Sequence, residues 1–315
     1  MAAFARKTSD HVSKGARKKL TWLTAFPALE SFQNPITRGL TRRLANDVYA
    51  RNLKSIDFEY YIRDTIYGDV ACVEYETSVP TRDNSIILFI HGGGFVCGSP
   101  RSQASLVLPA CMQTGLRGIG VDYTLAPEAR FPTPLDEIDA VYRALLNEEL
   151  HRKIMIVADT TGCALALGAL MRWRDVGVTA PAAIALISPM IDARAISDTH
   201  LTHKNLDPVM SSVSGHVTRR LFDHFAPGEA LDNPYLSPLY GDFSWAPPML
   251  VHAGTRDICL GDAARLTEKA ALQKVDARLR IFDGMFHSFQ LDWSLPESRR
   301  AHQDIANFFS EHCAG

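Results

Sequence analysis

The chain has 315 residues, of which 46% are hydrophobic and 22% charged, and its formal net charge is −2 at pH 7. These values are typical of an ordinary globular protein. The chain lacks the basic excess that would neutralise phosphates, which argues against a nucleic-acid partner. It also lacks an uncharged apolar run of about 18 residues, so no stable membrane anchor is predicted.

The cysteines are far apart in the sequence: Cys72, Cys97, Cys111, Cys163, Cys259 and Cys313. None of them forms a C-x-x-C pair, so neither a zinc site nor a disulfide framework is predicted. The N-terminal residues lack the apolar stretch of a secretory signal. We therefore expect reduced thiols in a cytoplasmic protein.

From about residue 58, short β-rich runs alternate with helical patterns, which indicates a mostly parallel sheet covered on both faces. The predicted strands are 58–65, 68–77, 85–91, 117–123, 153–159, 182–188, 248–254 and 276–283. The predicted helices have apolar residues at three- and four-residue spacing and lie near 102–114, 133–149, 161–174, 262–274 and 297–312. The pattern predicts one α/β domain spanning residues 1–315.

Two stretches do not follow this alternation, residues 1 to about 55 and residues 192 to about 242. Both flank predicted core elements, and we interpret them as a helical cap. The sequence contains no internal repeats or low-complexity linkers that would separate a second domain.

A cluster of glycines follows the predicted strand 85–91. The strand ends at His91 and runs into Gly92, Gly93 and Gly94. Consecutive glycines are costly unless the backbone must approach another group closely. A tight turn would explain them, but an HGGG loop after a strand also resembles the loop that supplies oxyanion donors in α/β-hydrolases. This second interpretation makes the backbone N–H groups of Gly93 and Gly94 the candidate donors.

The segment KIMIVADTTGCALALGAL predicts a buried strand that turns directly into an apolar helix. A nucleophile elbow has this arrangement. Aligned with the GDSAGG motif of esterases on Asp159 and Gly162, the segment has Thr160 at the nucleophile position. The backbone N–H of Thr161 would then be a third oxyanion donor.

Two further residues follow predicted strands in the chain order nucleophile, acid, base. Asp257 lies in GTRDICLGD after the strand 248–254, and His287 lies in DGMFHSF after the strand 276–283. Either residue alone has an ordinary explanation as a helix cap or a structural polar residue. Their joint position at strand ends favours a catalytic acid and base.

The segment DYTLAPEARFPTPLDE resembles the DYRLAPE segment of the same esterases. We expect Asp122, Tyr123 and Glu128 to support the loop below the oxyanion glycines rather than to act on substrate. His91, Gly92 and Asp159 are placed in the same supporting group.

Taken together, these motifs resemble the hormone-sensitive-lipase-like esterases, and the resemblance runs from about residue 60 to the C-terminus. It implies an α/β-hydrolase fold with an eight-stranded, mostly parallel sheet. It also implies a triad of Thr160, Asp257 and His287 that needs no cofactor. The histidines of the predicted cap have no convincing metal-ligand company, so no metal is expected.

A threonine at the elbow leaves three hypotheses open. The elbow commonly requires a positive φ, which β-branched residues disfavour. The first hypothesis is an esterase in which Thr160 attacks a small apolar ester. The second is a lyase or cyclase in which His287 removes a proton next to a carbonyl group, as some plant carboxylesterase-like dehydratases with this threonine suggest by analogy. The third is a binding protein without catalysis, resembling the gibberellin receptors.

Overall fold

One sheet forms the centre of the computed structural model, which describes residues 9–20, 27–79, 85–148, 153–211 and 213–313. The strand order is β1-β2-β4-β3-β5-β6-β7-β8. The strands are β1 (Tyr60–Tyr67), β2 (Val70–Thr77), β3 (Ile86–Ile90), β4 (Arg117–Val121), β5 (Ile154–Asp159), β6 (Ala183–Ile187), β7 (Met249–Gly254) and β8 (Ala277–Phe282). The predicted eight-stranded α/β-hydrolase architecture is confirmed.

The central strands of the sheet run parallel and are fully buried. β2 pairs antiparallel with β1 and β4, whereas all other neighbouring strands run parallel. Every residue of β3, β5 and β6 is buried, as expected for uninterrupted apolar strands that are covered on both faces.

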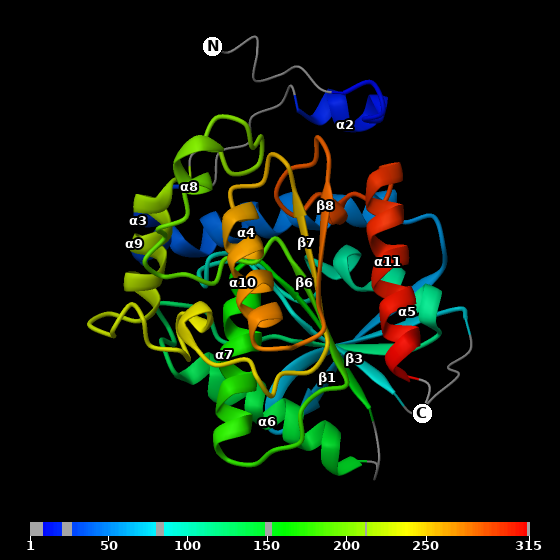
Figure 1. Cartoon of the computed structure of the whole chain (residues 1–315), viewed down its shortest axis with the longest axis vertical. Helices are drawn as coiled ribbons and strands as arrows, with labels where there is room; N and C mark the ends of the chain where they lie inside the picture. The colour runs from blue at the N-terminus through cyan, green and yellow to red at the C-terminus, as the bar shows by residue number, and fades with distance from the viewer. Residues whose placement is uncertain (1–8, 21–26, 80–84, 149–152, 212, 314–315) are drawn as a thin grey trace.

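Helices cover both faces of the sheet (Figure 1). On one face, α5 (Leu108–Thr114) and α11 (Pro296–Cys313) pack against side chains such as Ile87, Phe89 and Val157. The other face carries α6 (Thr133–Glu148), α7 (Thr161–Asp175) and α10 (Leu260–Leu272). Alternate residues of β3 and β5 therefore enter two separate apolar cores.

The segments predicted as a cap contain short helices, and residues 1–8 and 21–26 of the first segment lie outside the described residues. These helices are α2 (Lys14–Lys19), α3 (Leu29–Gln33), α4 (Arg38–Ala50), η1 (Arg51–Ser55), α8 (Thr199–Thr202), α9 (Gly215–Phe225) and η3 (Pro238–Tyr240). Two further short helices are η2 (Ala104–Leu106) and η4 (Phe289–Leu291).

The two predicted cap segments contact each other through α3 and α9, which lie side by side in Figure 1. The Arg220 guanidinium lies 2.5 Å from Glu30 Oε1, and Gln33 Nε2 lies 3.2 Å from His224 Nδ1. The extent of a cap remains a prediction.

The carboxyl ends of β3, β5, β7 and β8 meet at one edge of the sheet because these strands are parallel. The loops that follow them carry the predicted site residues. Among the described residues, no helix is both long enough and apolar enough to cross a membrane. No disulfide joins the cysteines in the part of the chain that the structure describes.

Candidate active site

Thr160 stands at the sharp turn between β5 and α7. Its backbone has φ 52° and ψ −116°, a conformation that disfavours β-branched residues. The turn is held by three backbone hydrogen bonds: Thr160 N–H donates to Ile187 O at 2.9 Å, and Thr160 O accepts from Cys163 and Met190 at 3.1 Å each. The surrounding strands thus impose a conformation that costs about 1–3 kcal/mol.

The hydroxyl of Thr160 reaches the side chain of His287. Thr160 Oγ1 lies 3.0 Å from His287 Nε2, and His287 Nδ1 lies 3.0 Å from Asp257 Oδ1. All three residues are buried. The predicted base is therefore within hydrogen-bond reach of both the predicted hydroxyl and the predicted acid, although the three residues come from different loops.

Two more buried carboxylates lie close to His287. Asp207 Oδ2 accepts the backbone N–H of His287 at 3.2 Å, and Asp159 Oδ2 accepts the Thr160 hydroxyl at 2.9 Å. Burial lowers the pKa of His287, but the charges of Asp257, Asp207 and Asp159 outweigh it and raise this pKa to about 9. The imidazole is consequently a stronger base than an ordinary histidine.

The pKa values of the surrounding carboxyl groups are pushed in different directions. Burial raises the pKa of Asp207 to about 6, and it also raises that of Asp159. Burial acts in the same direction on Asp257, but the charge and hydrogen bond of His287 prevail and lower its pKa. Asp257 is thus the carboxylate that is stabilised in its ionised form by the histidine.

Gly92, Gly93 and Gly94 pass directly beside the elbow. A Cβ atom on Gly92 would lie 2.6 Å from Asp159 Oδ2 and 2.9 Å from Thr160 Cβ. Gly93 has φ 117°, and a Cβ atom there would lie 2.1 Å from Cys97 O. Glycine is required at these two positions by the close approach of the backbone.

The hydroxyl of Thr161 accepts a hydrogen bond from one of the expected oxyanion donors. The backbone N–H of Gly94 donates to Thr161 Oγ1 at 3.0 Å. Thr161 is the fully buried first residue of α7. The motif that this segment resembles has alanine here, which cannot form this bond, and the sequence analysis considered only the backbone of Thr161.

His91 and Tyr123 support the glycine loop from below. Their rings are stacked with centroids 4.2 Å apart, and the Tyr123 hydroxyl donates to His91 O at 2.8 Å. His91 Nδ1 lies 2.8 Å from Gly92 O. Both side chains are buried, so they fix the point at which β3 enters the loop.

The supporting role of Asp122 and Glu128 stays a prediction, and the side chains of both residues are exposed. The backbone N–H of Asp122 donates to Ala71 O at 3.0 Å, which continues the pairing of β4 with β2 by one residue past the end of β4. Glu128 pairs with Arg38 at 3.0 Å and Arg42 at 2.7 Å on α4. Any support for the glycines is therefore indirect, because the loop turns both carboxylates toward solvent.

Ser288 is a site residue that the sequence analysis missed. Its hydroxyl donates to Asp159 Oδ1 at 2.5 Å and lies 3.3 Å from Thr160 Oγ1. Its backbone is left-handed, with φ 47°, and its N–H donates to Ser188 Oγ at 2.9 Å. Asp207 was missed as well. The only signal for Ser288 was its position directly after the predicted base, and the only signal for Asp207 was its position directly before Pro208.

An apolar cavity of about 190 Å³ opens onto these groups. Its polar end is formed by Gly93, Gly94, Thr160, His287 and Ser288. Its apolar wall comes from Leu44, Ala45, Val48, Met190, Val209, Met210, Leu221 and Leu291. An apolar group inside this cavity would be held against the Thr160 hydroxyl.

A second, larger cavity of about 530 Å³ is also lined by His287 and Ser288. It shares Val48, Tyr49 and Val209 with the first cavity but also includes Lys18, Lys19 and Asp292. Lys19 and Asp292 form an ion pair. The site therefore has one apolar chamber and one that contains charged groups.

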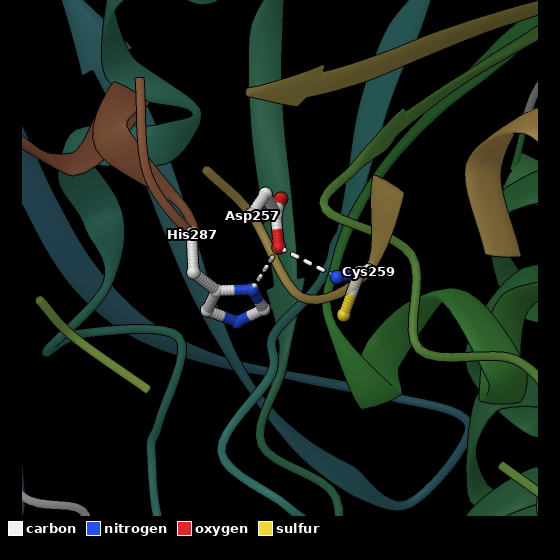
Figure 2. Close-up of side chains that lie close together, drawn as sticks. All are labelled: Asp257, Cys259 and His287. Atoms are coloured by element: carbon white, nitrogen blue, oxygen red, sulfur yellow. Dashed lines mark hydrogen bonds and ion pairs between the residues drawn. The ribbon is translucent and has the colours of Figure 1, made fainter. Parts of the chain in front are cut away.

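The predicted acid and base also lie beside Cys259, and these three residues are of the types that bind metal ions. One ligand atom each from Asp257, Cys259 and His287 falls within 4.8 Å of the others. Figure 2 shows the Asp257 carboxylate between His287 Nδ1 and the Cys259 backbone nitrogen, with the sulfur turned away. Burial raises the pKa of the Cys259 thiol, with Asp257 adding to the effect. A protonated thiol is a poor ligand, so the group fits an acid–base pair better than a metal centre.

Comparisons with known proteins agree with this geometry. Residues 87–291 match the model of a family described as having the alpha/beta hydrolase fold. An esterase of Acinetobacter venetianus is 34% identical, covering 74% of this chain and 77% of the relative. An acetyl-hydrolase of Streptomyces hygroscopicus is 32% identical, covering 79% of this chain and 84% of the relative.

Solved structures are similar over almost the whole chain. The crystal structure of an esterase from the bacterial hormone-sensitive lipase family has 29% sequence identity and a TM-score of 0.83. The match covers 96% of this chain and 99% of that chain. This chain therefore belongs to the α/β-hydrolases of the hormone-sensitive-lipase-like group and is an enzyme of the hydrolase class.

Proposed function

We propose that the protein is a carboxylic ester hydrolase in which Thr160 is the nucleophile, His287 the base and Asp257 the acid. The observation that carries this proposal is the continuous hydrogen-bonded line from Thr160 Oγ1 through His287 to Asp257, with both distances at 3.0 Å. This line ends at a strained elbow that faces an apolar cavity, which is the arrangement that acyl transfer requires.

The chemistry begins with proton transfer from Thr160 to neutral His287. Thr160 Oγ1 then attacks the ester carbonyl carbon, and Asp257 stabilises the imidazolium that forms. The backbone N–H groups of Gly93, Gly94 and Thr161 would receive the oxyanion. Because Gly94 already donates to Thr161 Oγ1, the oxyanion must replace that hydroxyl as the acceptor. His287 returns its proton to the leaving alcohol, and water hydrolyses the acyl-Thr160 ester.

The size of the apolar cavity indicates the substrate class. A cavity of about 150 Å³ accommodates a benzene molecule, so the apolar chamber of about 190 Å³ fits a short acyl chain. The esterase and acetyl-hydrolase relatives support a small-molecule ester. They give no support to the lyase or binding hypotheses.

The test compares wild type with Thr160→Ser and Thr160→Ala using p-nitrophenyl acetate. Thr160→Ser removes the methyl group and the β-branched strain, so we expect its turnover to rise about tenfold or more. Thr160→Ala lacks the attacking oxygen and should lose turnover and the acetyl adduct that intact mass measurement detects in wild type.

Ser310→Ala is the matched control, because the Ser310 hydroxyl on α11 bonds only within its own helix, to Ala306 O at 2.8 Å. It should behave as wild type does. Turnover that survives in Thr160→Ala at the wild-type rate would contradict the assignment of Thr160 as nucleophile.

A further inference from the structure

We propose that Ser288 is a second acyl acceptor in this site, which takes the acyl group from Thr160 before water releases it. This inference rests on the acyl-Thr160 ester proposed above. It assigns a covalent role to a primary hydroxyl that lies directly beside the predicted nucleophile.

The first argument is distance. Ser288 Oγ lies 3.3 Å from Thr160 Oγ1, and both residues line the apolar cavity. An acyl carbon bonded to Thr160 Oγ1 would lie near Ser288 Oγ, at a separation where aligned groups react readily, about 3–3.5 Å. The oxyanion donors that serve Thr160 would also serve this attack.

The second argument is that a carboxylate is in place to take the Ser288 proton. Ser288 Oγ donates to Asp159 Oδ1 at 2.5 Å. Asp159 is buried, and burial raises its pKa. A carboxylate with a raised pKa is a better general base than an ordinary aspartate.

The third argument is the backbone of Ser288, which adopts a left-handed conformation rarely used by residues other than glycine. Its φ is 47°, and the partner of its N–H, Ser188, has φ 48°. Strained positions of this kind cluster at functional sites. Here the strain turns the Ser288 hydroxyl toward Asp159 and Thr160.

The transfer step balances in protons and bonds. Ser288 Oγ attacks the acyl carbon and its proton passes to Asp159 Oδ1. His287, left neutral by acylation, takes up a proton from solvent, which its pKa of about 9 favours. The bond between the acyl carbon and Thr160 Oγ1 breaks, and Thr160 takes this proton from His287 Nε2, which lies 3.0 Å away. The products are acyl-Ser288, free Thr160, neutral His287 and protonated Asp159.

Hydrolysis of acyl-Ser288 restores the starting state. Neutral His287 takes a proton from water, which attacks the acyl carbon, and protonated Asp159 returns its proton to Ser288 as the carboxylic acid leaves. His287 then releases its proton to solvent and is again neutral. Ser288 also lines the larger cavity, so its ester is reachable from both chambers. A primary ester is less crowded than the ester of Thr160, which makes water attack easier.

The experiment locates the acetyl group after acid quench of the reaction with p-nitrophenyl acetate. Trypsin places Thr160 in peptide 154–172 and Ser288 in peptide 281–299. We expect wild type to carry acetyl on both residues, as located by fragmentation. Ser288→Ala should carry it on Thr160 alone and deacylate about tenfold more slowly, whereas Ser310→Ala should match wild type.

The outcomes separate this inference from the proposed function. Acetyl on Thr160 without any on Ser288 in wild type overturns the transfer and leaves the esterase proposal intact. Acetyl on Ser288 in Thr160→Ala also overturns it, because the acyl group would then arrive without Thr160. Turnover with no acetyl on either residue removes both proposals together.

Discussion

Among individual residues, His287 has the least ordinary environment, because three carboxylates surround one imidazole. The pKa of His287 is raised to about 9, and only the neutral ring can take a proton from Thr160. We therefore expect kcat for p-nitrophenyl acetate to rise with pH, to be half-maximal near pH 9 and to level off about one pH unit above it. A rate that is already constant below pH 7 would contradict this assignment.

Asp207→Asn tests the origin of this high pKa. The variant keeps an acceptor for the N–H groups of Val209 and Met210, which Asp207 Oδ1 receives at 2.9 and 3.1 Å. It removes the charge, together with the Oδ2 acceptor of the His287 N–H. The rising limb of the pH–rate profile should therefore move to lower pH. Asp136→Asn, which neutralises an exposed carboxylate on α6, should leave the limb in place.

Thr161 gives a second prediction for a single side chain. Thr161→Ala removes the hydroxyl that accepts from Gly94 and leaves that N–H available to an oxyanion. One oxyanion donor contributes about 10²–10³ in kcat in other enzymes, so we expect a rise of about tenfold with little change in KM. An unchanged or lower kcat would indicate that the Thr161 hydroxyl itself assists the reaction.

Among the elements, α4 is joined to the loop after the oxyanion glycines by one arginine. Arg42 donates to Val96 O at 2.8 Å, to Ala126 O at 2.6 Å and to both oxygens of Glu128. Arg42→Met leaves both carbonyls without this donor, which should lower the free energy of unfolding by about 1–3 kcal/mol. Urea titration followed by tryptophan fluorescence measures the change.

Glu128→Gln is the matched comparison for Arg42→Met. It removes only a half-exposed ion pair, so its cost should stay below about 1 kcal/mol. Equal losses in the two variants would mean that the backbone carbonyls contribute nothing and that the ion pair alone holds α4.

The sequence was sufficient to locate the strands because most of them are continuous apolar runs with both faces buried. Each predicted strand lies within about two residues of the observed one. The hydroxyl of Thr161 and the roles of Ser288 and Asp207 were missed. Their contacts join loops far apart in the chain, because Ser288 lies 129 positions after Asp159 and His287 lies 80 positions after Asp207. Such contacts depend on side-chain direction, which strand and helix patterns do not encode.

At the scale of the whole molecule, acid sensitivity comes from buried histidines away from the predicted triad, and His91, His252 and His302 are the described ones with a lowered pKa. Burial lowers the pKa of His91 to about 4, of His252 to about 3 and of His302 to about 4. An unfolded histidine takes up its proton near pH 6.5. The stability these groups provide is therefore present above about pH 6.5 and is lost as pH falls toward 4, at about 3 kcal/mol each.

This loss prevails over opposing effects in the same pH window. Asp207, whose pKa is raised to about 6, and Asp159, whose pKa is also raised, stabilise the folded state on acidification. His287 also opposes the loss, because its contribution grows as pH falls from 7.5 toward 6.5: the folded ring, with its pKa raised to about 9, already holds a proton that the unfolded ring has mostly lost at pH 7.5. Below about pH 6.5 its contribution is constant. We expect the free energy of unfolding in urea to fall between pH 7.5 and pH 5.

His252→Leu provides the control for this prediction. Neither ring nitrogen of His252 has a hydrogen-bond partner among the described residues, so leucine removes a titrating group without breaking a polar contact. The fall between pH 7.5 and pH 5 should become smaller in this variant. A fall equal to that of wild type would exclude His252 as a source of acid sensitivity.

The position of α4 connects substrate size with reaction rate. Leu44, Ala45 and Val48 on this helix form part of the wall of the apolar cavity, while Arg42 on the same helix holds the carbonyl of Val96 beyond the oxyanion glycines. In the proposed esterase, an acyl chain long enough to press on that wall would act through α4 on the loop that carries Gly93 and Gly94. Binding energy from the far end of the acyl chain is then available at the carbonyl carbon, so selectivity among acyl chains belongs to the chemical step as well as to binding.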